Sequence, residues 1–111
     1  METIDALTAL AALAHPKRLA AFRLLIGSEP HGLPAGKIAD ATSIPQSTMS
    51  VHLSTLARAG LIAGERRSRQ IVYRANVGRL DGLVRFLVDD CCGGRPEACA
   101  ALSAVRCGGS A

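Results

Sequence analysis

The spacing of apolar residues along the chain changes period twice, and this order of periods restricts the fold more than any other feature. Helical spacing runs through the first sixty residues, gives way to two β-prone runs at residues 61–65 and 70–74, and returns at Val77. The expected helices span residues 3–14, 16–27, 35–41, 45–60 and 77–90. The order ααααββα predicts a mainly α fold with a small β-hairpin, an α+β arrangement.

Residues with helix-capping preferences stand at several of these boundaries. Thr3 can cap the first helix, Pro16 suits the first position of the second, and Asn76 can cap the last. Ser43 and Gln46 match a capping box, which places the start of the fourth helix to within two residues. Only a tight turn then separates the third and fourth helices. We therefore expect a helix-turn-helix, with the hairpin following it as a wing.

Size and charge are those of a single globular domain with a basic surface. The chain has 111 residues, 49% of them apolar and 20% charged, and its formal net charge is +4. Eleven of its thirteen basic residues are arginines, which bind phosphates through two hydrogen bonds at once, so the excess favours a nucleic-acid partner. Only Phe22, Tyr73 and Phe86 are aromatic. This scarcity argues against readers of single strands and RNA, which stack bases on several aromatics.

No segment of the sequence resembles a secretory leader or a membrane span. Glu2 and Asp5 are acidic where a leader needs positive charge. The longest uncharged stretch, residues 41–57, contains proline, glutamine, histidine and several hydroxyl residues. We expect a cytoplasmic protein with no membrane partner.

One face of the expected fourth helix is apolar and the opposite face is small and polar. At about 100° per residue, Met49, Leu53 and Leu56 fall together as a buried seam. The opposite face has no long side chain until Arg58, so the helix can enter a DNA major groove, where hydroxyls can hydrogen-bond base edges and the Gln46 amide can pair with adenine. The candidate DNA contacts on this helix are Gln46, Ser47, Thr48, Ser50, Val51, Ser54 and Arg58.

The alternative for this face is an ordinary solvated helix. Serine and threonine are mediocre helix formers, however, so four hydroxyl residues within eight positions favour a binding role. For His52, at the edge of the seam, a packing role is at least as well supported as a DNA contact. No role is assigned to His15 or His31.

The expected hairpin has a basic tip. Arg66, Arg67 and Arg69 lie within four residues, and Arg74 follows on the return strand. We expect these arginines to contact DNA phosphates and the edge of the minor groove. The alternative is a solvated basic turn, but the position directly after the groove-reading helix favours contact with DNA.

Two long segments carry a family resemblance. One is LAALAHPKRLAAFRLL, and the other is GKIADATSIPQSTMSVHLSTLARAGLIAGERRSRQIVYRAN. Together they resemble the ArsR family of winged helix-turn-helix repressors over roughly residues 5–90. The resemblance implies a homodimer, joined through its first and last helices, that blocks a promoter on double-stranded DNA until an inducer binds. An apolar stripe on each terminal helix agrees with such a dimer. The expected interface residues are Leu7, Leu10, Leu83 and Leu87.

All four cysteines lie beyond residue 90. Cysteines of a disulfide framework would be spread through the fold, so this confinement indicates a site added to a domain that is complete without it. We expect residues 1–90 to form the DNA-binding and dimerisation domain and residues 91–111 a cysteine-rich, inducer-binding tail. The cysteine pair of many arsenic sensors in this family is missing from GLPAGKIAD, and the histidines of related zinc sensors are missing from NVGRLDGLVRFLVDD. The tail is instead similar to that of arsenic-responsive members with a vicinal pair and a third cysteine.

Trivalent arsenic is the ion that this tail suits best. It takes three thiolate ligands, and soft thiolates select such ions. Cys91 and Cys92 are adjacent, and the GGRPEA turn can bring Cys99 back to them. Trivalent antimony should bind in the same way, while Cys107 could substitute, assist or do nothing. We expect a repressor that leaves its operator when arsenic binds.

Another soft metal and thiol oxidation are the main alternatives for these cysteines. The C-C-x6-C-x7-C spacing lacks the C-x2-C knuckle that zinc sites prefer. The acidic neighbours Asp89 and Asp90 disfavour the thiolate that a redox switch needs. An arsenic carrier that does not bind DNA would leave the groove helix and the wing unexplained. An enzyme is not expected, because the spacing from Cys99 to Arg106 does not match a phosphatase loop and no Cys/His pair is evident.

Overall fold

The computed structural model describes residues 1–90, and the cysteine-rich tail predicted for residues 91–111 lies outside them. In the described part, the helices are α1 (Thr3–Leu13), α2 (Pro16–Gly27), α3 (Ala35–Thr42), α4 (Gln46–Arg58) and α5 (Val77–Arg85), which continues into the π-helical turn η1 (Phe86–Asp90). The strands are β1 (Leu33–Pro34), β2 (Ile62–Arg67) and β3 (Gln70–Ala75). The predicted winged helix-turn-helix and its mainly helical α+β class are confirmed.

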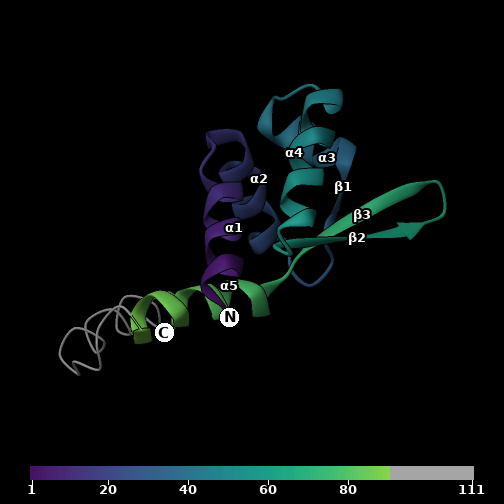
Figure 1. Ribbon diagram of the computed structural model, residues 1–111. Helices are drawn as coiled ribbons and strands as arrows, with labels where there is room; N and C mark the ends of the chain where they lie inside the picture. The colour runs from purple at the N-terminus through teal and green to yellow at the C-terminus, as the bar shows by residue number, and fades with distance from the viewer. Residues whose placement is uncertain (91–111) are drawn as a thin grey trace.

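The side chains that hold the helices together come from α2, α3, α4 and the start of the hairpin. The largest fully buried ones are Leu25, Ile38, Met49, Leu53, Leu56 and Leu61. The predicted apolar seam of α4 is therefore confirmed. Figure 1 shows α1 and α2 beside the α3–α4 pair, with the hairpin projecting to one side and α5 running along the base. None of the helices in residues 1–90 is both long and apolar enough to cross a bilayer.

The wing is longer and its turn is tighter than the sequence suggested. Strands β2 and β3 pair in antiparallel register as far as Arg67, which lies opposite Gln70. Only Ser68 and Arg69 turn the chain, and Ser68 has the positive φ of 58° that two-residue hairpin turns require. The expected four-residue tip is therefore wrong, because Arg66 already belongs to a strand.

Strand β1 was not predicted, because residues 28–34 carry only loop signals. Leu33 and Pro34 pair with Tyr73 and Val72 of β3, so the sheet has the order β1-β3-β2. Proline cannot donate to a strand ladder, which suits the edge position of Pro34. The pairing fixes the start of α3 against the wing.

Two predicted helix starts are confirmed by their hydrogen bonds. Pro16 occupies the first turn of α2, and the His15 ring before it accepts a hydrogen bond at Nδ1 from a backbone N–H of that turn at 3.1 Å. The Oδ1 atom of Asn76 accepts a hydrogen bond from the backbone N–H of Arg79 at 3.0 Å, and its side-chain amide donates to the carbonyl of Gly60 at 3.1 Å. Asn76 thus caps α5 and ties it to the end of the α4 segment.

Two other expected caps are wrong. Thr3 lies inside α1, and Glu2 precedes the helix with its backbone N–H donating to the Asp5 carboxylate at 3.3 Å. Ser43 ends α3 in the left-handed conformation, with a φ of 56°, and Pro45 occupies the cap position of α4. The predicted capping box does not form, because the serine that would open α4 already closes α3.

The last helix divides its apolar residues between the protomer's own core and the surface. Leu83 is only 3% exposed within one chain, so it packs in the protomer's core and is not part of an open apolar face. Leu7, Leu10 and Leu87 are exposed as expected. The predicted uninterrupted α-helix is wrong in its final turn, which is π-helical.

Candidate nucleic-acid interface

The outer face of α4 has the exposure that its sequence pattern predicted. Met49, Leu53 and Leu56 have no accessible surface on the inner side. Of the seven predicted DNA contacts on this helix only Thr48 is half-buried. The exposed ones are Gln46, Ser47, Ser50, Val51, Ser54 and Arg58. A face of short exposed side chains allows the helix to approach base edges closely in a major groove.

The N-terminus of α4 is open as well. Pro45 occupies the cap position and forms no side-chain hydrogen bond to the first turn. Backbone N–H groups at such a helix start carry partial positive charge and favour a phosphate. The first turn can therefore contact the DNA backbone while the side chains that follow face the bases.

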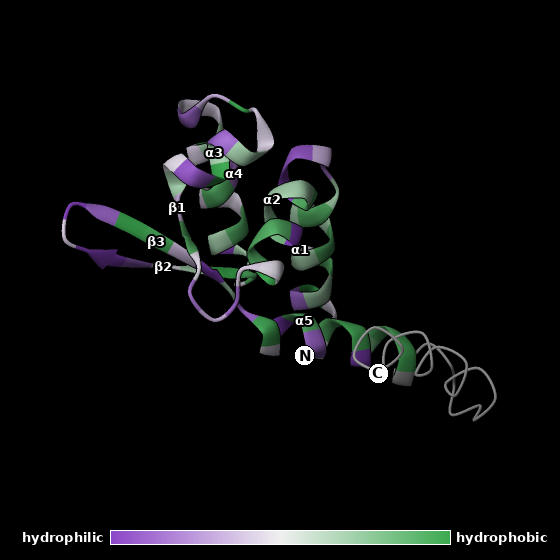
Figure 2. Cartoon of the chain, turned by 180° about the vertical axis from the view of Figure 1, so that it is seen from behind, coloured by the Kyte–Doolittle hydropathy of each residue, from purple (hydrophilic) through white to green (hydrophobic). Residues whose placement is uncertain are grey.

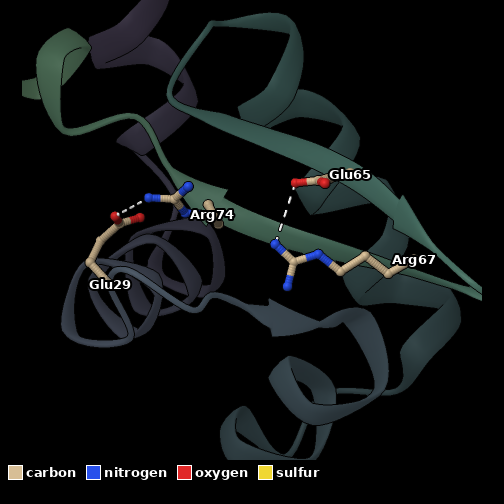
Figure 3. A network of polar contacts seen from close by, with 4 residues as sticks. All are labelled: Glu29, Glu65, Arg67 and Arg74. Atoms are coloured by element: carbon tan, nitrogen blue, oxygen red, sulfur yellow. Dashed lines mark hydrogen bonds and ion pairs between the residues drawn. The ribbon is translucent and has the colours of Figure 1, made fainter.

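The wing carries arginines at its surface. Arg66, Arg67 and Arg69 are all exposed. Arg67 forms an ion pair with Glu65 at 3.4 Å (Figure 3), but both side chains are more than half exposed, and pairs of this kind contribute little to stability. A phosphate can therefore replace Glu65 as the partner of Arg67 at small cost.

Arg74 has a different role from the one that the sequence suggested. Its guanidinium donates a hydrogen bond to the Glu29 carboxylate at 2.8 Å, and Glu29 lies in the loop before β1 (Figure 3). The hydrogen bond to Glu29, followed by the charge of that carboxylate, raises the pKa of Arg74 above its ordinary value. The prediction that Arg74 faces DNA phosphates is wrong, because this side chain ties the return strand of the wing to the loop before β1.

His52 is a packing residue on the inner side of α4. It is 9% exposed, and its ring centroid lies 4.6 Å from that of His15. Burial, followed by the positive charges of His15, Arg18 and Lys17, lowers the pKa of His52 below its ordinary value. The packing alternative is therefore confirmed. The sequence gave no signal for the contact with His15, since the two residues are far apart along the chain.

The lowered pKa of His52 predicts a loss of stability in acid. Below about pH 6.5 the unfolded chain binds a proton at this residue more readily than the folded chain does. The free energy of unfolding should therefore fall as the pH drops through 6.5 toward the lowered pKa of the folded state. In urea unfolding between about pH 7.5 and 5.5, His52→Gln should flatten this dependence. The control is His31→Gln on an exposed histidine, and a wild-type slope in the His52 variant would contradict the assignment.

The predicted metal ligands Cys91, Cys92, Cys99 and Cys107 lie outside the described residues. Within residues 1–90, no three histidine, cysteine or carboxylate side chains come together as a group that could hold a metal ion. The functional surface presented by this part of the chain is the outer face of α4 together with the arginines of the wing.

Comparison with known proteins identifies relatives of this arrangement. Residues 13–65 match the helix-turn-helix domain family. The chain is 31% identical over 83 residues to the HTH-type transcriptional regulator YgaV of Escherichia coli (strain K12), a match that covers 75% of this chain and 82% of YgaV.

Solved structures show the same fold. An ArsR-like transcriptional regulator from Rhodococcus sp. RHA1 superposes with a TM-score of 0.70 at 23% identity, over 93% of this chain and 91% of that one. A homodimeric winged helix-turn-helix DNA-binding domain from Mycobacterium bovis gives a TM-score of 0.61 at 27% identity, over 83% of this chain and 85% of that one. The first likeness extends to the fold alone, whereas the second protein is also described as a dimer that binds DNA.

Proposed function

Because the chain belongs to the ArsR family of winged helix-turn-helix transcriptional regulators, we propose that it is a homodimeric repressor that binds operator DNA and is released by trivalent arsenic. One observation carries the DNA-binding part of this proposal. Gln46 and Ser50 of α4 line the same surface groove as Arg69 and Gln70 of the wing. A base-reading helix and a cationic strand on one face can engage the same duplex at the same time.

The two parts of this face have separate tasks on DNA. The exposed side chains of α4 read bases, because hydrogen bonds at base edges distinguish one sequence from another. The arginines of the wing neutralise phosphates, which supplies affinity for any sequence and makes binding depend on salt. Variants of the two parts should therefore fail in different ways.

Replacing Arg67 or Arg69 with alanine should weaken binding to operator and random DNA alike. Each lost phosphate contact should reduce the slope of log K against log salt by about one. Replacing Gln46 or Ser47 with alanine should instead reduce the preference for operator over random DNA. Fluorescence anisotropy with both duplexes over a salt series measures the two effects.

The control for these variants is Arg23→Ala, because Arg23 is an exposed arginine on α2 and does not line the groove. It should leave both the salt slope and the sequence preference unchanged. If the wing variants altered only the sequence preference, the assignment of tasks to α4 and the wing would be wrong.

The homodimer is proposed from an exposed apolar face. Ile4, Leu7 and Leu10 on α1 are 70%, 60% and 39% exposed, and Leu87 near the chain's last described turn is 38% exposed. Figure 2 shows hydrophobic stretches along α5 where it extends away from the other helices. A second copy that covers these side chains would remove their apolar surface from water. It would also place two copies of α4 about 34–36 Å apart, one turn of DNA.

Sedimentation should show a dimer at micromolar concentration. Leu7→Asp should shift the protein toward monomer, because it places a charge in the proposed interface. The same change at Leu19, which is 43% exposed on α2, is the matched control and should leave the dimer intact. A wild-type monomer would refute the proposal, as would equal dissociation by the two variants.

The inducer is proposed from the cysteines that follow η1. Cys91, Cys92 and Cys99 supply the three thiolates that trivalent arsenic or antimony requires. Cys91 directly follows the helical segment that carries Leu87, so a metalloid bound there would act next to the proposed dimer contact. Other soft metals and thiol oxidation are distinguished from arsenic by titrating the protein–operator complex with arsenite, methylarsenite, antimonite, cadmium, zinc and a thiol oxidant.

A further inference from the structure

A groove of about 520 Å³ runs between the helix-turn-helix and the wing. Lys37 and Asp40 of α3 lie on its helical wall, beside Gln46 and Ser50 at the start of α4. The other wall is the wing, where Arg69 marks its outer end. Three segments that are separate in the sequence therefore meet at one groove, and α3 contributes to it although neither sequence nor family assigned α3 a contact.

Each wall of the groove carries one exposed cation. Lys37 and Arg69 are both exposed, and neither takes part in the ion pairs found within residues 1–90. Arg74, by contrast, is already paired with Glu29. The charges of Lys37 and Arg69 are therefore available to a ligand that enters between the two walls.

The wing side of the groove is apolar between its charged ends. Ile71 is 44% exposed and lies there with Tyr73 and Pro34. A single strand of a DNA duplex presents this same alternation, because apolar deoxyribose faces separate its phosphates. A small anion could use the cations but would leave the apolar wall in water.

We propose that one strand of the operator's sugar–phosphate backbone lies in this groove, with a phosphate bound by Lys37 across from the one bound by Arg69. This inference rests on the proposed DNA-binding function and adds α3 to the interface as a third contacting element. Asp40, three residues after Lys37 on the same wall, repels a phosphate there. The strand is therefore held toward Lys37 and the wing.

Lys37→Ala should lower affinity for operator and random DNA alike, by roughly eightfold at 0.1 M salt, and should reduce the salt slope by about one. Lys17, the chain's other lysine, is exposed on α2 and does not line the groove. Lys17→Ala is therefore the matched control and should bind as the wild type does. Thermal unfolding of both variants checks that the folds are intact, since both side chains are at the surface.

Asp40→Asn supplies a test of opposite sign. Removing its charge should raise affinity for all sequences severalfold and leave the operator preference unchanged. If wild-type protein binds operator but Lys37→Ala behaves like Lys17→Ala, or Asp40→Asn gives no gain, the groove assignment is overturned while the DNA-binding function stands. If wild-type protein binds no DNA, the proposed function itself fails.

Discussion

Replacing Gly32 with alanine is expected to destabilise the domain by about 2–5 kcal/mol. Gly32 has a φ of +76°, in the left-handed region where a residue with a Cβ atom loses about 1–2 kcal/mol. A Cβ built at this position would also collide with the Tyr73 carbonyl oxygen and the Arg74 side chain. Relieving such overpacking costs about 1–3 kcal/mol more. Urea unfolding at neutral pH measures the sum.

Gly27 provides the matched control for this substitution. It is the last residue of α2, and a Cβ atom added there would meet nothing within 4 Å. Gly27→Ala should be neutral or stabilise the protein by up to about 1 kcal/mol, because alanine restricts the unfolded chain more than glycine does. Equal losses in the two variants would show that general sensitivity to alanine, and not the contact of Gly32 with the wing, explains the effect.

The damage from Gly32→Ala should also reach DNA binding. The atoms that a Cβ would displace belong to β3, which carries the wing's hydrogen bonds to both β1 and β2. A shift of this strand would move Arg69 relative to α4. We therefore expect a smaller salt slope in Gly32→Ala, measured at a temperature where it remains folded.

Local signals predicted most of the helices and the wing. Pro16 and Asn76 stand at helix starts because their preferences depend on a few neighbouring residues. The seam of Met49, Leu53 and Leu56 follows from helical geometry once α4 is recognised. The exposed contact face of α4 was predictable for the same reason, since it is what remains on the opposite side.

Features that depend on distant contacts were not predictable in this way. Strand β1 exists because two residues of a loop pair with β3, and a two-residue segment has no period to detect. Ser43 satisfies a capping pattern, yet the turn between α3 and α4 needs it in the left-handed conformation. Local preference was overridden by tertiary geometry at both places.

The site shows the same limit among its charged residues. Arg74 looks like the other arginines of the wing, and only the position of Glu29, 45 residues earlier, removes it from the DNA-facing set. Lys37 looks like a solvated helix residue until the wing is placed opposite α3. Which cations face DNA is therefore a property of packing and not of composition.

Arsenite is expected to release the protein from its operator, with a loss of DNA affinity of about a hundredfold. Such a loss requires a coupling free energy of roughly 2.7 kcal/mol between the two sites. Three thiolates that close on one ion would pull on the end of the helix that carries Leu87 and so strain the proposed dimer. Binding can release DNA only if it favours the released geometry. By reciprocity, operator DNA should weaken arsenite binding by the same factor, which titration of the free and the DNA-bound protein measures.

Serine at any one of Cys91, Cys92 or Cys99 should leave DNA affinity intact and abolish this release. Two sulfur ligands hold trivalent arsenic far less well than three, and a serine hydroxyl is a hard ligand for a soft ion. Cys107→Ser is the internal control, since it removes a thiol from the same tail and should change induction little. Each variant is compared in anisotropy titrations of the protein–operator complex with arsenite. An induction-proof Cys107 variant, or a Cys92 variant that is released as readily as the wild type, would refute the triad and move the site.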